Sequence, residues 1–275
     1  MGGRARVVIQ SRLGSSRLPG KAMLSLAGQP MVVLAARRAA GLGADVVVAT
    51  STEPEDDVLA GAVRAAGFEV VRGPLADPLA RFVIATRDLA ATDVVVRLTA
   101  DNVFPDGALV AELVEAVRSG RRPYARVGGD DPSVPYGVAG EAFTVAALRE
   151  ADLAPEANRE HVTPWIRKHH GESVLAPADL PKRWRGLRCT VDTLDDYVRV
   201  ARLFAGVPDP VAPSWRELCD LLLQQGAPAE EWPASKDNVL GQSPMILGTV
   251  QLGLAYGAAN RQGMPTDEEA QAILR

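Results

Sequence analysis

The 275-residue chain contains little cysteine, few aromatic residues and no long apolar run. Its two cysteines, Cys189 and Cys219, are too few for a disulfide framework and lack metal-ligand spacing, so we expect packing residues in a reducing cytoplasm. No stretch reaches the ~20 apolar residues of a membrane span or the ~7–15 of a secretory signal. With 30 basic against 34 acidic residues, the net charge of −4 predicts no general attraction to nucleic acid or membrane lipid.

Short β-branched runs alternate with alanine-rich amphipathic segments along the first part of the chain. The runs at 7–10, 46–50, 69–72 and 94–99 predict buried strands, and segments 31–40, 54–66 and 78–90 predict helices. This alternation requires right-handed crossovers between parallel strands. It therefore predicts an α/β fold with a mostly parallel sheet and helices on both faces.

The rest of the chain divides into three parts. A first domain over 1–225 is completed by strands at 140–144 and 188–192 and by helices at 107–118, 145–150, 158–169, 194–205 and 214–224. Residues 120–136 form a polar connection that is rich in glycine and proline. Residues 226–244 have the composition of a linker, and residues 245–275 form one strand, a glycine-rich loop and a helix.

The connection QSRLGSSRLPGKAMLSLAGQ follows the first predicted strand and is about twenty residues long, against a usual length of ~4–6. It carries Arg12, Arg17 and Lys21 together with serines and three glycines. Glycines let backbone amides approach a ligand, and the cations neutralise phosphate oxygens. Because the loop lies at the carboxyl end of a strand, where open α/β sheets bind ligands, we predict a triphosphate site. A solvated basic loop is the alternative interpretation.

Two common phosphate-binding motifs do not fit this loop. A P-loop needs four residues between its glycine and Gly-Lys, followed by Ser or Thr. Here five residues separate Gly14 from Gly20-Lys21, and Ala22 follows. The dinucleotide fingerprint GxGxxG is also missing from this turn, so the sequence argues against both Walker ATPases and Rossmann dehydrogenases.

Aspartates follow two predicted strands, in VVVRLTADN and in RCTVDTLDDY. Asp101 and Asp192 stand where a carboxylate can hold Mg²⁺ against a nucleotide phosphate, whereas a helix cap or turn is the alternative for Asp101. Asp195 and Asp196 are better explained as acids of a first helical turn. A cationic loop and two strand-end carboxylates together predict metal-assisted nucleotidyl transfer, with Lys21 and the arginines neutralising developing charge.

Five blocks of the chain, in this order, resemble the spore-coat polysaccharide (SpsF-type) cytidylyltransferases, relatives of the CMP-sialate and CMP-Kdo synthetases: VVIQSRLGSSRLPGKAMLSLAGQPM, VVVATSTEPEDD, VVRLTADN, REHVTPWI and RCTVDTLDDY. The resemblance implies a Rossmann-like nucleotidyltransferase fold, CTP as donor, Mg²⁺ as cofactor, a small-molecule acceptor and a homodimer.

The resemblance also assigns roles to residues. It implies that Lys21, Arg12 and Arg17 act in catalysis and that Asp101 and Asp192 bind the metal. The predicted nucleotide-binding residues are Gln10, Ser11, Arg12, Gly14, Ser15, Arg17, Lys21, Thr99 and Ala100, and the predicted acceptor-binding residues are Tyr136, Glu141 and His161. A structural hydrogen bond at the start of a helix is an equal alternative for His161. We expect the Lys21 side chain to face solvent without ligand.

Two departures from the family bear on the acceptor. Relatives often have aspartate where Ala139 stands and Cys-Pro where Asn102-Val103 stands, whereas Glu141 is retained. The altered pocket leaves open a sugar acid, a phosphorylated molecule or another small acceptor. It also motivates a second hypothesis, a nucleotide-binding or regulatory module that has lost catalysis.

The last thirty residues have a resemblance of their own. ILGTVQLGLAYGAANRQGMPTDEEAQAILR resembles the opening strand and helix of an aldo-keto reductase barrel, which needs eight such units. A nicotinamide-dependent reductase is therefore a third hypothesis. Because the segment stops before the catalytic residues of such a reductase, we expect an incomplete fusion without reductase activity.

Overall fold

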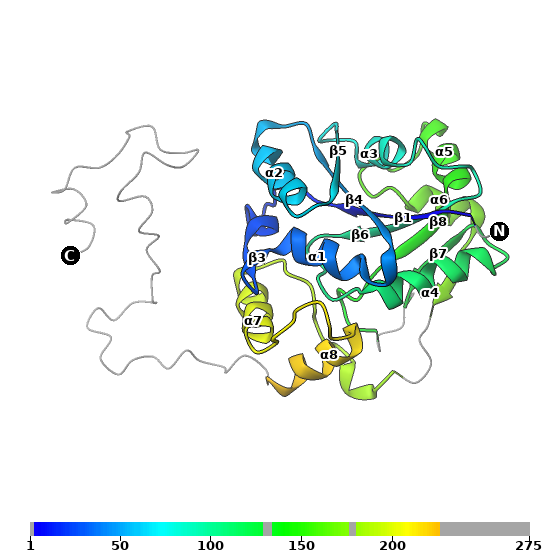
Figure 1. Cartoon of the computed structure of the whole chain (residues 1–275). Coiled ribbons are helices and arrows are strands. Elements are labelled where there is room, and N and C mark those ends of the chain that lie inside the picture. Colours follow the sequence, from blue (N-terminus) through cyan, green and yellow to red (C-terminus); the bar gives the residue numbers. More distant parts are fainter. Residues whose placement is uncertain (1–2, 129–133, 176–179, 226–275) are drawn as a thin grey trace, which may run out of the picture. The chain divides into compact units, whose positions relative to one another are not determined.

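A seven-stranded sheet organises the chain, which the computed structural model describes over residues 3–128, 134–175 and 180–225 (Figure 1). The strand order is β5-β4-β1-β6-β8-β7-β9. The strands are β1 (Ala5–Gln10), β4 (Asp45–Ser51), β5 (Glu69–Gly73), β6 (Val94–Thr99), β7 (Tyr124–Val127), β8 (Glu141–Thr144) and β9 (Ser173–Leu175). Strand β8 pairs antiparallel with β6 and β7, and the other pairs are parallel. The predicted mostly parallel α/β fold is confirmed.

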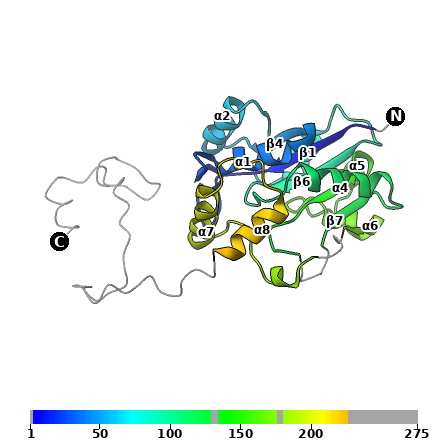
Figure 2. The ribbon, with the colours of Figure 1, turned by 60° about the horizontal axis from the view of Figure 1, so that its bottom comes forward.

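Helices cover both faces of this sheet. One face packs against α1 (Met31–Ala39), α2 (Asp57–Ala65), α4 (Gly107–Arg118), α7 (Leu194–Ala205) and α8 (Trp215–Gln224). The other packs against α3 (Pro78–Ala85), α5 (Val145–Leu153) and α6 (Pro164–His170). Along β1, Val7 and Ile9 enter the first layer and Val8 the second, as the two-residue period of a strand requires. Figures 1 and 2 show α7 and α8 on the side of α1 and α4.

The parallel strands bring their carboxyl ends to one edge. Gln10 lies opposite both Ala49 and Thr99 in the register of the three central strands. Beyond this row, the amide of Ala100 donates to the carbonyl of Gln10 at 3.1 Å. The loop after β1 and the turn after β6 therefore begin side by side, and the sheet itself places the two predicted site segments together.

The structure changes several predicted boundaries. Helix α3 ends at Ala85 rather than residue 90: the backbone of Thr86 leaves the helical conformation, and its hydroxyl donates to the carbonyl of Phe82 at 2.8 Å. Helix α6 begins at Pro164 rather than residue 158. The predicted strand at 188–192 is wrong: its pairing consists of a single bridge between Tyr136 and Arg188. Strands β7 and β9 were not predicted, and β7 lies within the connection predicted over 120–136.

Buried Arg38 of α1 fixes the segment that joins α7 to α8. Its guanidinium donates to the carbonyls of Pro210 and Pro213 at 2.9 Å each, and to that of Phe104 at 2.9 Å. Burial lowers the pKa of Arg38 to about 10, although Asp106 and Asp209 oppose the shift. The arginine remains charged near neutral pH and ties the connection between α7 and α8 to α1 and to the segment that follows β6.

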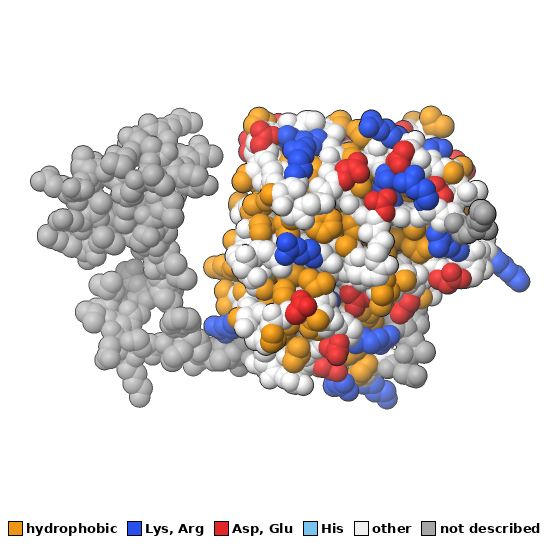
Figure 3. All heavy atoms as spheres, in the orientation of Figure 1, with side chains coloured by type: hydrophobic (Ala, Val, Ile, Leu, Met, Phe, Trp, Pro, Cys, Tyr) orange, Lys and Arg blue, Asp and Glu red, His pale blue; other side chains and the backbone are white. Residues whose placement is uncertain are grey.

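Two surface features agree with the composition. On the face drawn in Figure 3, acidic and basic side chains are interspersed with hydrophobic ones rather than gathered by sign. No helix in the described parts of the chain is both long and apolar enough to cross a bilayer.

Cys189 and Cys219 are buried and do not form a disulfide, although their sulfurs lie 3.9 Å apart, which confirms their prediction as packing residues. The predicted linker at 226–244 and the strand–helix unit at 245–275 lie outside the described residues.

Candidate functional site

The long loop after β1 is anchored by Asp56, the residue that directly precedes α2 as its N-cap. The Asp56 carboxylate accepts hydrogen bonds from the amide of Leu13 at 2.8 Å, from the Thr50 hydroxyl at 2.9 Å and from both the amide and hydroxyl of Ser51. Burial favours the neutral acid, but these donors hold the pKa of Asp56 below its ordinary value. The carboxylate therefore fixes the start of the loop against β4.

The end of the loop is shaped by a short 3-10 turn, η1 (Lys21–Met23), and by the hairpin β2 (Ser25–Leu26) and β3 (Gln29–Pro30). Gly20, at the N-cap of η1, has φ +74°, a left-handed conformation that favours glycine. Ala22 and Leu26 are buried in the core. These contacts fix the backbone on both sides of Lys21, which leaves its side chain directed at the sheet edge.

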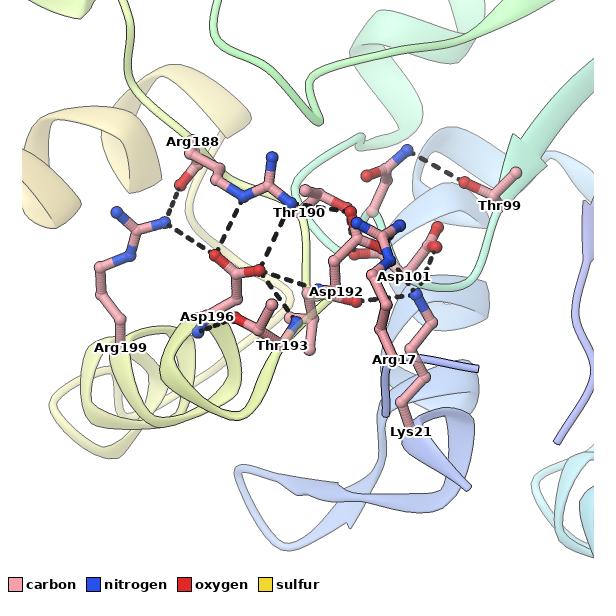
Figure 4. A network of polar contacts seen from close by, with 12 residues as sticks. Arg17, Lys21, Thr99, Asp101, Arg188, Thr190, Asp192, Thr193, Asp196 and Arg199 are labelled. Atoms are coloured by element: carbon pink, nitrogen blue, oxygen red, sulfur yellow. Dashed lines mark hydrogen bonds and ion pairs between the residues drawn. The ribbon is translucent and has the colours of Figure 1, made fainter. Parts of the chain in front are cut away.

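Lys21 joins the two predicted metal carboxylates (Figure 4). Its Nζ lies 2.7 Å from Oδ2 of Asp101 and 3.0 Å from Oδ1 of Asp192, and it also donates to the carbonyl of Val191 at 2.9 Å. Its side chain is only 13% exposed. The prediction that Lys21 faces solvent is therefore wrong, because the ammonium is needed between two neighbouring carboxylates. The predicted convergence of Asp101, Asp192 and Lys21 is confirmed.

Asp192 is surrounded by three cations. Besides Lys21, its Oδ1 lies 2.9 Å from Arg17, and its Oδ2 accepts from Arg188 at 2.7 Å. The side chain is 6% exposed. Burial alone would raise the pKa of Asp192, but Lys21, Arg17 and Arg188 together lower it. The site therefore holds Asp192 in its charged form.

Asp196 and Arg188 form a support behind Asp192, and neither was predicted to belong to the site. Asp196 caps α7 and accepts from the amides of Asp192 and Thr193 at 3.0 Å each, which confirms its prediction as a first-turn acid. It also binds Nε of Arg188 at 3.0 Å, which raises the pKa of Arg188. Arg188 lies four residues before Asp192. This spacing predicts an ion pair only within a helix, and the segment was predicted as a strand, so the pair could not be recognised from the sequence.

All nine residues predicted to bind nucleotide line one cavity of about 330 Å³, the loop cavity. They are Gln10, Ser11, Arg12, Gly14, Ser15, Arg17, Lys21, Thr99 and Ala100, and Asp101 and Asp192 close the wall. Arg12 also lies 3.9 Å from Glu160. The Ser11 hydroxyl is buried here without a hydrogen-bond partner among the described residues. The wall of the loop cavity thus combines cationic side chains, backbone of the loop and one hydroxyl that lacks a hydrogen-bond partner.

A larger cavity of about 920 Å³, the main cavity, adjoins the loop cavity, and Arg17, Thr99, Asp101 and Asp192 line both. Tyr136 and His161, two predicted acceptor-binding residues, lie in its wall. The amide of Tyr136 donates to Leu187 and its carbonyl accepts from Cys189. Gly137 (φ +101°) permits this approach, because a Cβ there would lie 2.5 Å from the Thr190 nitrogen. This pairing places Tyr136 beside the Asp192 segment.

Glu141, the third predicted acceptor-binding residue, lies in a different cavity. Its Oε1 accepts from the hydroxyls of Tyr124 and Thr163 at 2.6 Å each, and Arg97 binds its Oε2. Val162 stands at φ +67°, a strained conformation for a β-branched residue, and the turn sets Thr163 toward Glu141 and His161 into the main cavity. Glu141 therefore organises this wall, whereas the His161 side chain stays exposed.

The comparisons with known proteins match this geometry. Residues 6–204 fit the family described as cytidylyltransferase. The chain is 30% identical over 226 residues to the spore coat polysaccharide biosynthesis protein SpsF of Bacillus subtilis (strain 168), covering 78% of this chain and 92% of the relative.

Two solved structures share the fold. A cytidylyltransferase from Leptospira borgpetersenii serovar Hardjo-bovis (strain JB197) superposes with a TM-score of 0.72 at 23% identity, over 81% of this chain and 95% of the other. A CMP:2-keto-3-deoxy-manno-octonic acid synthetase complexed with CTP gives a TM-score of 0.55 at 22% identity, over 74% of this chain and 98% of the other.

Proposed function

The chain belongs to the cytidylyltransferase family, and on that premise we propose that it transfers CMP from CTP to a hydroxyl group of a small acceptor with Mg²⁺ bound at Asp101 and Asp192. The observation that carries the proposal is the contact of one ammonium, Lys21, with both carboxylates at the wall of the loop cavity. The choice of CTP rests on the family, and a solved structure of the same fold is complexed with CTP.

The loop cavity suits the triphosphate. Arg12, Arg17 and Lys21 supply positive charge at its wall, and the buried Ser11 hydroxyl supplies a donor that has no partner among the described residues. Cations and backbone amides fixed before the ligand arrives cost little reorganisation when phosphate charge develops. Arg17 is 62% exposed, so its side chain can leave Asp192 for a phosphate oxygen.

The donor set at Asp101 and Asp192 fits Mg²⁺. Carboxylate oxygens are its preferred protein ligands, and the ion usually takes one or two of them plus substrate phosphates and water. The described residues contain no cluster of three or more metal-ligating side chains, so phosphate would have to complete the coordination. Bound there, Mg²⁺ would supply Lewis-acid neutralisation of the phosphate charge.

The reaction we propose is an in-line displacement. A hydroxyl oxygen of the acceptor, held in the main cavity beside Tyr136 and His161, forms a bond to the α-phosphorus of CTP. The bond between that phosphorus and the oxygen bridging to the β-phosphorus breaks, pyrophosphate leaves, and the hydroxyl proton passes to water. Lys21 and Arg17 lie where they can neutralise the negative charge that accumulates on the phosphates.

Nucleotide binding and pyrophosphate release test this proposal directly. We expect CTP with Mg²⁺ to raise the melting temperature more than UTP, ATP or GTP, and pyrophosphate to appear when sugar acids and phosphorylated sugars are supplied as acceptors. Lys182→Ala, at an exposed position, is the matched control for variants of Lys21. Failure of every nucleotide to bind at millimolar concentration with Mg²⁺ contradicts the proposal. CTP binding without turnover on any acceptor favours the module that has lost catalysis.

Replacing the loop anchor tests whether the loop geometry matters. We expect Asp56→Asn to raise KM for CTP about tenfold while kcat falls less, because the amide keeps the volume but loses charged acceptors for Leu13, Thr50 and Ser51. Asp57→Asn is the control, since Asp57 is exposed in the first turn of α2 and does not contact the loop. Steady-state kinetics with varied CTP give the result, and equal effects of the two variants would contradict an anchoring role.

A further inference from the structure

A third cavity of about 340 Å³, here called the annex, opens beside the main cavity. Thr99, Asn102, Val127 and Ala139 line both cavities. The wall of the annex also contains Arg97, Arg126 and Arg167, which come from β6, β7 and α6. Three separate elements thus bring cationic side chains to one small space next to the predicted acceptor position.

Two of these arginines are held by glutamates, which keeps the wall in place. Arg126 makes two hydrogen bonds to Glu172, at 2.6 and 3.1 Å, and Arg97 pairs with Glu141 and donates to Gln10 at 3.2 Å. Glu141 accepts three hydrogen bonds, from Arg97, Tyr124 and Thr163. Burial and Glu141 raise the pKa of Tyr124, so its hydroxyl stays a donor. The glutamate therefore positions Arg97 rather than receiving a ligand.

Donors remain at the wall after these pairings. The Nε of Arg97 is buried and has no hydrogen-bond partner among the described residues. Arg167 is exposed on α6, and no acidic side chain of the described residues lies within salt-bridge distance of it. The wall of the annex thus includes Arg167, which has no acidic partner among the described residues, and Arg97, whose buried Nε has no hydrogen-bond partner there, although Arg97 pairs with Glu141 in the same wall.

The annex does not include the reacting centre. Lys21, Asp101 and Asp192 line the other cavities but not this one. A group bound in the annex is therefore separate from the oxygen that attacks the α-phosphorus. Ala139 at the shared wall carries no charge, and the carboxylate of Glu141, which also lines the annex, is paired with Arg97.

We propose that the annex binds a phosphate monoester carried by the acceptor, with Arg167 as its principal ligand and Arg97 as a second donor. This inference rests on the proposed function, because it identifies the class of acceptor: a small hydroxylated molecule with a phosphate remote from the hydroxyl that attacks. A phosphate monoester has three terminal oxygens and up to two negative charges, whereas a carboxylate has two oxygens and one charge. The open donors of two arginines match the phosphate better.

The experiment uses the full chain with Mg²⁺ and α,β-methylene-CTP, which fills the loop cavity without turnover. Inorganic phosphate and acetate are then titrated calorimetrically against the wild type, Arg167→Gln and Lys168→Gln. Lys168 is the matched control, since it is exposed on the same turn of α6 but does not line the annex. We expect phosphate to bind, Arg167→Gln to weaken it about tenfold, Lys168→Gln to change it less than about twofold, and acetate to bind about tenfold more weakly than phosphate.

The other possible results contradict either the assignment of the annex or the proposed function. Equal phosphate affinity in Arg167→Gln and Lys168→Gln, no phosphate binding to the wild type, or equal binding of acetate and phosphate overturns the assignment of the annex. The affinity of α,β-methylene-CTP for Arg167→Gln reports whether the variant remains folded at the site. If the wild type does not bind α,β-methylene-CTP, the proposed function fails, whereas analogue binding without phosphate binding overturns only the annex.

Discussion

Replacing Lys21 with alanine is expected to reduce CMP transfer by about 10²–10³-fold, the usual cost of removing one fixed group that stabilises a charged transition state. The ammonium lies 2.7 Å from Asp101 and 3.0 Å from Asp192, within the wall of the loop cavity. Its loss removes positive charge from the phosphate site and leaves two carboxylates close together. Pyrophosphate release at saturating CTP measures the effect, with Lys182→Ala as the surface control.

The same variant distinguishes a charge-bridging role from a purely catalytic one. Without Lys21, repulsion between Asp101 and Asp192 should lower the melting temperature, and millimolar Mg²⁺ should restore it by binding between the two carboxylates. The wild type should gain less from Mg²⁺ alone, because Lys21 already compensates both charges. A melting temperature of Lys21→Ala that does not respond to Mg²⁺ would argue against a metal at this pair.

Asp192→Asn is expected to reduce activity by about 10³-fold or more and to lower the free energy of unfolding by about 1–3 kcal/mol. The amide cannot compensate Lys21, Arg17 and Arg188, which all contact this carboxylate. The loss of stability stays modest because Arg17 is 62% exposed and solvent screens its charge. Asp195→Asn, at an exposed position in the first turn of α7, three residues after Asp192, should be close to neutral.

The stability cost of Asp192→Asn should depend on pH. The cations hold the pKa of Asp192 below its ordinary value in the folded protein, so its charge stabilises the fold fully above the unfolded pKa of ~3.9. This contribution disappears as the pH falls through the lower folded pKa. Urea unfolding of the wild type and the variant should therefore differ most above the unfolded pKa and converge only as the pH falls below the lowered folded pKa. A constant difference across this range would contradict an electrostatic role for Asp192.

The sequence alone predicted much of the site, because the end of a buried strand can be recognised from the residue types along it. A buried β-branched run followed by aspartate places that carboxylate at the carboxyl edge of a parallel sheet, and this held for Asp101 after β6. The length and charge of the loop identified Arg12, Arg17 and Lys21, which all line the loop cavity, whereas the full set of predicted nucleotide-binding residues came from the family resemblance. These features are local, since a strand's direction and a loop's composition need no partner from elsewhere in the chain.

Other features depended on contacts that the chain's local pattern does not encode. The segment at 188–192 has the composition of a strand, yet it makes one bridge to Tyr136 and its remaining geometry is set by Asp196 and Arg188. Strands β7 and β9 are short, and β9 gains its pairing only beside β7 at the edge of the sheet. Strand propensity depends on neighbours, so such segments follow tertiary context.

From the sequence by itself came the α/β class, the cationic loop and the two aspartates, because hydrophobic period, glycine content and charge are properties of neighbouring residues. Only the tertiary structure decided that Lys21 bridges those aspartates, that Asp56 anchors the loop, and that Glu141 pairs with Arg97 in the wall of the annex. Each of these joins residues that are distant in the chain, and such pairs form only when the packed sheet brings their side chains within hydrogen-bonding distance.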